Sequence, residues 1–129
     1  MEISLPDLPV LSDVERSCLG RYVTLLVERL GEHLEEVILF GSVARGESWP
    51  RGMPIRSDLD LLVVSAAPLD EATTDALLDA TLPLFLESGR QIGPQFRTRE
   101  QLEQPPDERA RAFLANLERD RIRLYARSF

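Results

Sequence analysis

The sequence has 129 residues, which is the size of one compact domain, and we expect a single domain over residues 1–129. Hydrophobic residues make up 43% of the chain and charged residues 29%, a balance that excludes a disordered chain and a disulfide scaffold. The formal net charge of -7 argues against broad binding to a nucleic-acid backbone, because that binding requires a basic face.

The residue types that are missing exclude several enzyme classes. All fifteen basic residues are arginine, so a phosphate-loop lysine, Schiff-base chemistry and a lysine general base are all excluded. The single cysteine, Cys18, and the single histidine, His33, cannot form a disulfide or a structural zinc site. We see no leader and no apolar run of the roughly 18 to 20 residues that cross a bilayer, so we expect a cytoplasmic protein without membrane contact.

The first half of the chain predicts one helix and two strands. Ser12 and Asp13 can cap a helix that begins near Val14 and ends at about residues 31–33, with apolar residues recurring on one face. Residues 36–40 form a short apolar run that predicts a buried strand ending at Gly41. Residues 46–56 read as a loop, and residues 57–64 predict a second strand whose later half is apolar on both faces.

The second half predicts a long helix, a strand and a last helix. The long helix opens at Asp70, runs to about residue 87 and is kinked at Pro83. Residues 91–98 predict a third strand, at a sheet edge or bulged because of its glycine and proline, followed by a capping box at Thr98. A last helix starts at Asp107 and extends its apolar face toward Ile122, Leu124 and Tyr125. This order predicts an α/β (α+β) fold, a small mixed sheet with flanking helices.

Asp58 and Asp60 are the first candidates for chemistry. They are two residues apart in a strand, so their side chains leave the same face about 6 to 7 Å apart. Two carboxylates this close repel each other unless a positive charge lies between them, and hard oxygen ligands suit magnesium. A pair of this kind also occurs simply at a solvated strand start, so by itself it favours neither interpretation.

Gly41 and Ser42 add a second feature directly after the first buried strand. Glycine lets the backbone approach an oxyanion, the serine hydroxyl can donate to phosphate, and the following residues 43–45 are of types that can open a short helix. A phosphate cradle and a metal pair at neighbouring strand ends favour a nucleotide site together more than either feature does alone.

The segments ILFGSVARGE and SDLDLLVV resemble the minimal nucleotidyltransferases of the DNA polymerase beta superfamily. The resemblance implies a polymerase-beta-like nucleotidyltransferase fold, with the beta and gamma phosphates of a nucleoside triphosphate held by Gly41 and Ser42. It implies two magnesium ions on Asp58 and Asp60. Arg45 is a candidate for contact with the triphosphate, with a solvent-exposed arginine as the alternative. The segment NLERDRIRLYAR is similar to the closing helix and short strand of single-domain members.

The sequence departs from the family in two places. The loop between Ser42 and Asp58 is a few residues longer than the family's usual spacing, and its Trp49 either stacks on a base or covers an apolar patch. The family also places a third acidic residue on the following strand, whereas this chain has neither Asp nor Glu between Glu87 and Glu100. Gln91 or Gln95 is expected there, and an amide neither binds metal well nor accepts a proton. Glu87 and Glu100 are conceivable substitutes, although helix-end solvation explains both.

These features lead to three hypotheses. The first is a magnesium-dependent nucleotidyltransferase that moves a nucleoside monophosphate, AMP from ATP in the first instance, onto a hydroxyl of a protein or small molecule. The resemblance implies that such a chain is the antitoxin of a pair with a HEPN-type helical toxin, and that a homo-oligomer or hetero-complex completes the acceptor site. The second is a catalytically weak nucleotide-binding module that acts by forming a complex with a helical partner. The third is an interaction domain without a ligand.

Overall fold

The structure is a computed structural model, and it describes residues 3–46 and 58–127. Within these residues four strands form one mixed sheet in the order β3-β2-β1-β4. β1 pairs antiparallel with both β2 and β4, and β2 pairs parallel with β3. The strands are β1 (Leu34–Phe40), β2 (Leu59–Ser65), β3 (Ile92–Thr98) and β4 (Ile122–Ala126).

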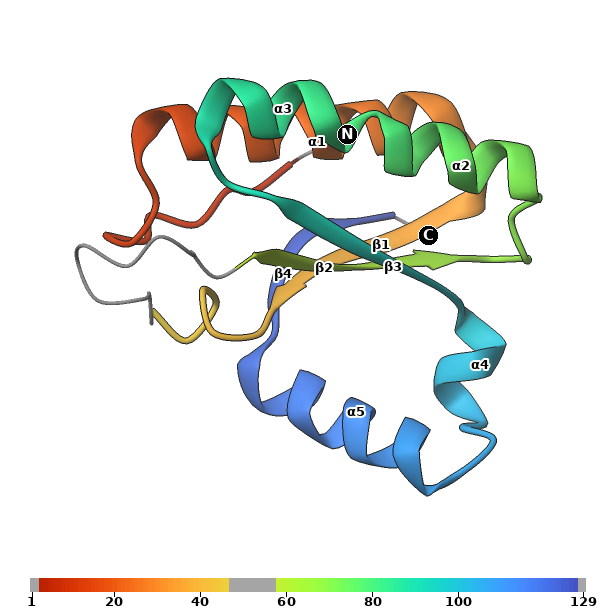
Figure 1. Cartoon of the computed structure of the whole chain (residues 1–129). Helices are drawn as coiled ribbons and strands as arrows, with labels where there is room; N and C mark the ends of the chain where they lie inside the picture. The colour runs from red at the N-terminus through yellow and green to blue at the C-terminus, as the bar shows by residue number, and fades with distance from the viewer. Residues whose placement is uncertain (1–2, 47–57, 128–129) are drawn as a thin grey trace.

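Helices cover both faces of the sheet, as Figure 1 shows. One face is covered by α1 (Asp13–Leu30), α2 (Glu71–Asp79) and α3 (Thr81–Ser88), and the other by α4 (Arg99–Glu103) and α5 (Glu108–Asp120). A single 3-10 turn, η1 (Gly31–His33), joins α1 to β1. The predicted α/β fold with a small mixed sheet is therefore confirmed. Of the helices in the described part of the chain, none combines the length and the apolar character that a membrane span requires.

The side chains of β2 alternate between the two faces of the sheet and pack into two apolar clusters, as its sequence predicts. Leu61 and Val63 are buried against the α1 face. Leu62 and Val64 are buried on the opposite face, where they pack with Leu117 of α5. A strand that is apolar on both sides must lie in the interior of the sheet, and β2 does lie between β1 and β3.

The predicted long helix is two helices. α2 ends at Asp79 and α3 begins at Thr81, so the chain breaks at Ala80 and not at Pro83. Pro83 lies in the first turn of α3, where a missing amide hydrogen costs nothing, because the first amides of a helix have no helical partner. A helix that ran through this point would press the proline ring against the carbonyl of residue 79, so the break falls one turn earlier.

The last predicted helix is also shorter than its apolar pattern suggests. α5 begins after its cap Asp107, as predicted, and ends at Asp120. Ile122, Leu124 and Tyr125 lie in strand β4 and not on a helix face. The short strand that the resemblance implied is therefore present. It pairs with β1 along the edge of the sheet opposite β3.

A buried ion pair joins the start of α1 to the start of β3. The side chains of Glu15 and Arg90 are almost fully buried, and Arg90 Nε donates to Glu15 Oε2. Glu15 also completes a capping box with Ser12 at the start of α1, accepting from the Ser12 amide at 3.1 Å. Burial raises the pKa of Glu15, but the hydrogen bonds from Arg90 and Ser12 outweigh it and lower the pKa.

Several backbone groups along the outer edge of β3 are absent or already hydrogen-bonded to side chains. The Leu59 amide donates to Gln91 O, which places alternate backbone groups of β3 on the side away from β2. On that side Pro94 has no amide hydrogen, and the carbonyl of Phe96 accepts from Arg97 Nη1 at 2.8 Å. The Thr98 amide is taken by Gln101 at 2.9 Å. A further strand therefore finds few backbone partners along this edge.

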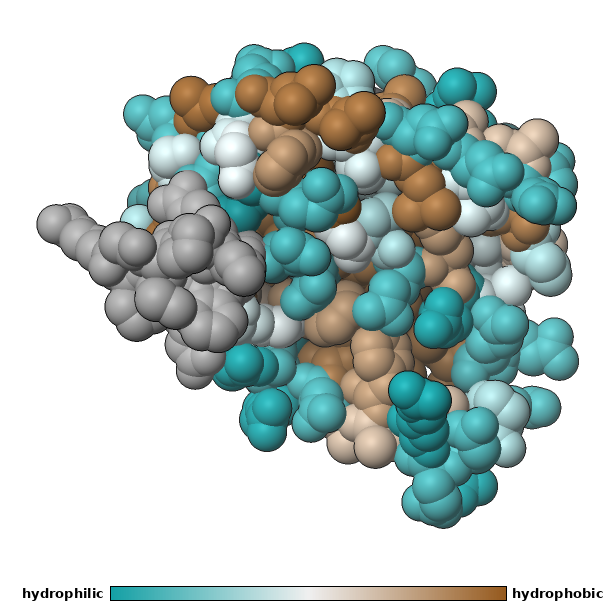
Figure 2. All heavy atoms as spheres, in the orientation of Figure 1, coloured by the Kyte–Doolittle hydropathy of each residue, from teal (hydrophilic) through white to brown (hydrophobic). Residues whose placement is uncertain are grey.

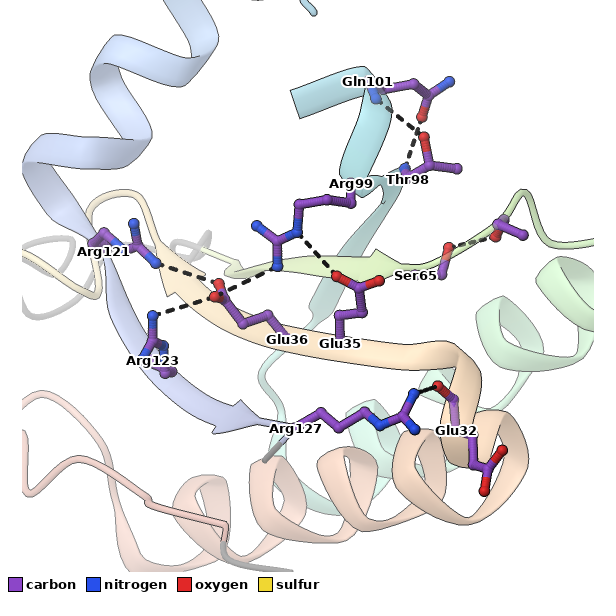
Figure 3. A network of polar contacts seen from close by, with 11 residues as sticks. Glu32, Glu35, Glu36, Ser65, Thr98, Arg99, Gln101, Arg121, Arg123 and Arg127 are labelled. Atoms are coloured by element: carbon purple, nitrogen blue, oxygen red, sulfur yellow. Dashed lines mark hydrogen bonds and ion pairs between the residues drawn. The ribbon is translucent and has the colours of Figure 1, made fainter. Parts of the chain in front are cut away.

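Four side chains, which we call the Glu36 cluster, lie where β1, β4 and α4 meet. Glu36 is nearly buried and pairs with three arginines, shown in Figure 3. Arg99 Nη2 lies 3.6 Å from its Oε1, Arg121 Nη2 lies 3.3 Å from its Oε2, and Arg123 Nη2 lies 3.2 Å from its Oε1. Since Arg99 opens α4 and Arg121 follows α5, the cluster holds both ends of the segment that covers this face of the sheet.

Candidate active site

Gly41 brings the turn after β1 directly against Asp60 of β2. The register pairs Phe40 with Asp60, so the residue that follows the strand lies beside this carboxylate. Gly41 has a φ of 83°, and a Cβ at this position would lie 2.4 Å from Asp60 Oδ2. Only glycine fits both the backbone conformation and the space, so a glycine is required at this position.

Asp58 and Asp60 lie on one face at the start of β2, as their spacing predicts. A Cβ at Gly93 of β3 would lie 3.7 Å from Asp60 Oδ1 and 3.9 Å from Asp58 Oδ2, so both carboxylates reach the same point. Asp60 is half-buried and Asp58 is exposed. Burial, followed by the charge of Asp58, raises the pKa of Asp60.

The two negative charges of Asp58 and Asp60 suit the binding of a cation. In the described residues, we find neither carboxylate in a hydrogen bond or ion pair, although arginines neutralise the buried glutamates elsewhere. Two carboxylates that repel each other and have no arginine partner among the described residues are the kind of oxygen site that a hard divalent cation occupies. The described residues contain no group of three or more His, Cys, Asp or Glu residues that could hold a metal.

The position beside the two carboxylates on the next strand is Gly93, which the sequence analysis did not single out for the site. The parallel register places Gly93 opposite Asp60. The expectation of Gln91 or Gln95 at this place is wrong. Gln91 Nε2 donates to Thr81 Oγ1 at 3.3 Å and to Ile92 O at 2.9 Å. Gln95 lies two residues beyond Gly93 on β3, opposite Leu62. The substitutes Glu87 and Glu100 are also placed elsewhere, since Glu87 pairs with Arg21 and Glu100 lies in α4.

The turn after Gly41 is not the helix start that the residue types suggested. The amide of Arg45 donates to Gly41 O at 3.2 Å and the amide of Gly46 to Val43 O at 2.9 Å, which makes one tight turn. Ser42 is half-buried at the beginning of this turn, next to the glycine that contacts Asp60. The candidate phosphate contacts in the described turn are therefore the Gly41 backbone and the Ser42 hydroxyl.

Arg45 is held by the end of α5. Its Nη1 lies 2.7 Å from Asp120 Oδ2, and Arg119 Nε donates to the other oxygen of Asp120 at 3.1 Å. The hydrogen bond from Arg119, and then that from Arg45, lower the pKa of Asp120 against the opposing effect of desolvation. The predicted loop over residues 46–56, with Trp49 as a candidate for base stacking, lies outside the described residues apart from Gly46.

A cavity of about 510 Å³ opens on the same side of the sheet as the two carboxylates, between β3, α4 and α5. Figure 2 shows the corresponding surface in its lower centre, where apolar side chains are exposed between hydrophilic ones. The apolar side chains of its lining are half-buried, and its two arginines are exposed. Its lining includes Gln95, Arg97, Leu102, Arg109, Phe113 and Leu114.

The comparison with protein families agrees with this geometry. The family described as the nucleotidyltransferase domain matches residues 21–119, a span that contains the Gly41 turn, both carboxylates and Gly93. The chain belongs to the nucleotidyltransferase domain family and is thus a nucleotidyltransferase by class. No curated protein matches the sequence significantly.

Solved structures with the same fold include toxin–antitoxin complexes and an antibiotic-modifying enzyme. A mutant of the MntA-HpeT toxin-antitoxin has 16% identity and a TM-score of 0.54, with 84% of this chain and 73% of that chain covered. The tri-AMPylated Shewanella oneidensis HEPN toxin in complex with its MNT antitoxin has 14% identity and a TM-score of 0.51, with 87% and 72% covered. Spectinomycin adenyltransferase AAD(9) from Enterococcus faecialis, with ATP and spectinomycin, has 16% identity and a TM-score of 0.58, with 88% and 56% covered.

Proposed function

We propose that this chain is a magnesium-dependent nucleotidyltransferase that moves AMP from ATP onto a hydroxyl group of a protein, and that it serves as the antitoxin partner of a HEPN-type helical toxin. The observation that carries the proposal is the contact between the Gly41 turn and Asp60, which brings a phosphate-binding turn and a pair of carboxylates to one point. The names of the solved structures that share this fold support AMP as the group and a helical toxin as the partner.

Each residue of the site has a separate role in this proposal. Asp58 and Asp60 hold magnesium, which when bound stabilises the negative charge that develops on the phosphates. The Gly41 backbone approaches the terminal phosphates closely, and the Ser42 hydroxyl donates to them. Arg45 contacts the triphosphate after it exchanges its ion pair with Asp120 for one with phosphate.

The reaction exchanges one bond to phosphorus for another. The acceptor hydroxyl oxygen forms a bond to the alpha phosphorus, while the bond from that phosphorus to the bridging oxygen breaks and pyrophosphate leaves. The hydroxyl proton passes to solvent, because β3 offers no carboxylate at Gly93 to accept it. Positioning and charge stabilisation must therefore supply most of the catalysis.

Transfer of label from ATP tests the proposal. The protein is incubated with α-labelled ATP, magnesium and a candidate HEPN-type protein, and the label on that protein is measured. We expect transfer that is lost on chelation and in Asp60→Asn. Asp75→Asn is the matched control, since Asp75 is an exposed aspartate on α2, away from the sheet. Equal transfer by both variants refutes the assigned roles.

A second candidate function is a nucleotide-binding module that acts through complex formation. It is favoured by Gly93, which adds no carboxylate to the two that the described residues place in the site, and by an exposed apolar surface on α2 and α3, visible along the upper edge of Figure 2. We call this surface the α2–α3 patch; it consists of Leu78, Leu82, Phe85 and Leu86. Residues 70–88 carry acidic side chains and no basic ones, so the patch suits an amphipathic helix with basic flanks.

Separate variants distinguish the two candidates. Leu82→Glu and Leu86→Glu place charges in the α2–α3 patch at positions that are 57% and 74% exposed, so the fold tolerates them. If complex formation is the function, these variants release a helical partner in a pull-down while Asp60→Asn retains it. If transfer is the function, toxin neutralisation in cells is lost in Asp60→Asn even though the complex persists.

A further inference from the structure

We propose that the chain forms a two-fold symmetric dimer, in which the α2–α3 patch of each copy docks into the cavity between β3, α4 and α5 of the other. The proposal commits both surfaces to a second copy of this chain. It goes beyond the proposed function and does not depend on it, since it concerns assembly and not transfer.

The patch and the cavity lie on the same face of the molecule. Figure 2 shows the patch along its upper edge and the cavity in its lower centre. A second hollow, of about 460 Å³, joins them along the outer edge of β3. This hollow begins at Leu78 of the patch and shares Gln95, Arg97 and Gln101 with the cavity. One docked molecule can therefore cover the patch, the hollow and the cavity together.

One of the two surfaces projects and the other is hollowed. Leu82 and Leu86 lie one turn apart on α3 and are 57% and 74% exposed. The cavity has a volume of about 510 Å³, and its half-buried lining includes Leu102, Phe113 and Leu114. In a single copy, both the projecting leucines and the apolar lining contact water. Docking of the patch into the cavity removes both from water, which favours association.

The α2–α3 patch lies in an acidic part of the chain. Residues 70–88 contain five acidic residues and no basic one. Arg21 of α1 pairs with one of them, Glu87, at 2.7 Å, which leaves the segment with an acidic excess. Asp75 and Asp79 are exposed on α2, the helix that carries one of the patch leucines. Two patches that faced each other would therefore repel, so a second patch is not the docking partner.

The cavity carries the opposite charge. Arg97 of β3 and Arg109 of α5 are both exposed in its lining. Among the described lining residues the one carboxylate is Asp107, which accepts from the Ala110 amide at 2.8 Å at the start of α5. The result is a local positive excess in a protein whose net charge is -7. The acidic patch of a second copy is therefore attracted to the cavity.

A single two-fold rotation makes both contacts at once. The patch lies on the α2–α3 side of the sheet and the cavity on the α4–α5 side, with the outer edge of β3 between them (Figure 1). When two copies face each other across a two-fold axis along this edge, the patch of each meets the cavity of the other. A head-to-tail contact without this symmetry would leave a patch and a cavity open at the ends and would add further copies.

The outer edge of β3 makes this a dimer of side-chain contacts and not a continuous sheet. Pro94 has no amide hydrogen, and the Phe96 carbonyl and the Thr98 amide are already hydrogen-bonded to side chains. Two β3 edges that face each other therefore find few backbone partners. The association must depend on the apolar contacts and on the opposite charges of the patch and the cavity.

Variants that exchange the charge across this contact test the proposal. Leu86→Arg places a positive charge in the patch, against the arginines of the cavity. Arg109→Glu places a negative charge in the cavity, against the acidic patch. Both positions are exposed, so the fold tolerates the changes, which circular dichroism checks, and Leu82→Arg serves as a second patch variant. The matched control is Arg111→Glu, since Arg111 is exposed on α5, pairs with Glu108 and does not line the cavity.

Sedimentation equilibrium measures the dissociation constant of the dimer. Each charge variant alone should raise this Kd about 100-fold, because it weakens two symmetric contacts by about tenfold each. The control should stay within about twofold of the original protein. An equimolar mixture of Leu86→Arg and Arg109→Glu should recover a Kd within about tenfold of the original, since a mixed dimer has one unchanged contact and one in which the introduced charges are opposite.

Several results would overturn the proposal. A protein that stays monomeric up to about 1 mM has no such dimer, and a series of larger assemblies indicates a head-to-tail contact. Dissociation by Leu86→Arg without an effect of Arg109→Glu indicates that two patches meet. A mixture that does not recover association rejects the pairing of patch with cavity. Binding of a HEPN-type protein to the patch of a chain that is itself monomeric assigns the patch to that protein and also overturns the proposal.

Discussion

Replacement of Gly41 by alanine separates the geometry of the site from the stability of the fold. Gly41 has a φ of 83° and Gly46, in the same turn, has a φ of 78°. Alanine in a left-handed conformation costs about 1 to 2 kcal/mol, so both Gly41→Ala and Gly46→Ala should unfold several degrees below the original protein. Thermal unfolding of the two variants measures this shared cost.

The two variants differ in what the new methyl group meets. A Cβ at Gly46 has nothing within 4 Å, whereas a Cβ at Gly41 would lie 2.4 Å from Asp60 Oδ2. Asp60 must move by about 1 Å to restore an ordinary contact, and a misplacement of this size in an active site costs roughly 100-fold in rate. We expect transfer of labelled AMP to fall about 100-fold in Gly41→Ala and to stay within about threefold in Gly46→Ala. Equal activity in the two variants would refute the claim that this turn positions Asp60.

Three further predictions concern charges at the site and in the core. Because the pKa of Asp60 is raised, its contribution to stability is present below its ordinary pKa and is lost as the pH rises through the raised value. At neutral pH, magnesium should therefore raise the melting temperature, by the equivalent of about 1.4 kcal/mol at ten times its Kd. In differential scanning fluorimetry, Asp60→Asn should abolish both the pH dependence of stability and the stabilisation by magnesium. Arg90→Met should cost about 3 to 5 kcal/mol at neutral pH in urea unfolding, because it leaves Glu15 buried without its partner. The lowered pKa of Glu15 means that this cost should shrink as the pH falls below its ordinary value, and a constant difference from pH 3 to 7 would contradict the assignment. Gly93→Asp should increase magnesium-dependent transfer about 100-fold by adding a proton acceptor beside Asp60, whereas the uncharged Gly93→Asn should not; equal rates for the two would exclude that role.

The part of the site that follows local rules could be predicted from the sequence. Asp58 and Asp60 share a face because strand side chains alternate, and Gly41 ends a strand that its apolar residues already mark. The resemblance to the nucleotidyltransferases depends on the same two segments, and the α/β fold follows from the order of the predicted helices and strands. These features require only the spacing of residues within a few positions of one another.

The other features of the fold and of the site depend on pairings between segments that are distant in the sequence. Gly93 lies beside the carboxylates because β3 pairs parallel with β2 in one register, and no local pattern fixes that register. The end of α5 at Asp120 was missed for a similar reason, since Ile122, Leu124 and Tyr125 suit either a helix face or a strand until β1 is available to pair with. The break at Ala80 could have been predicted from the sequence, because the clash of a proline with the carbonyl four residues earlier places the break before Pro83.

The Glu36 cluster determines how freely the outer wall of the cavity can move. The chain leaves the sheet at Arg99 and returns at Arg121, so α4 and α5 form a closed loop that is fastened at both ends to one carboxylate. Such a loop swings outward only when several ion pairs break together, and its resting position is therefore set before any molecule arrives. The cavity is therefore preformed, and raised ionic strength, which weakens these partly exposed pairs, should make its outer wall more adaptable.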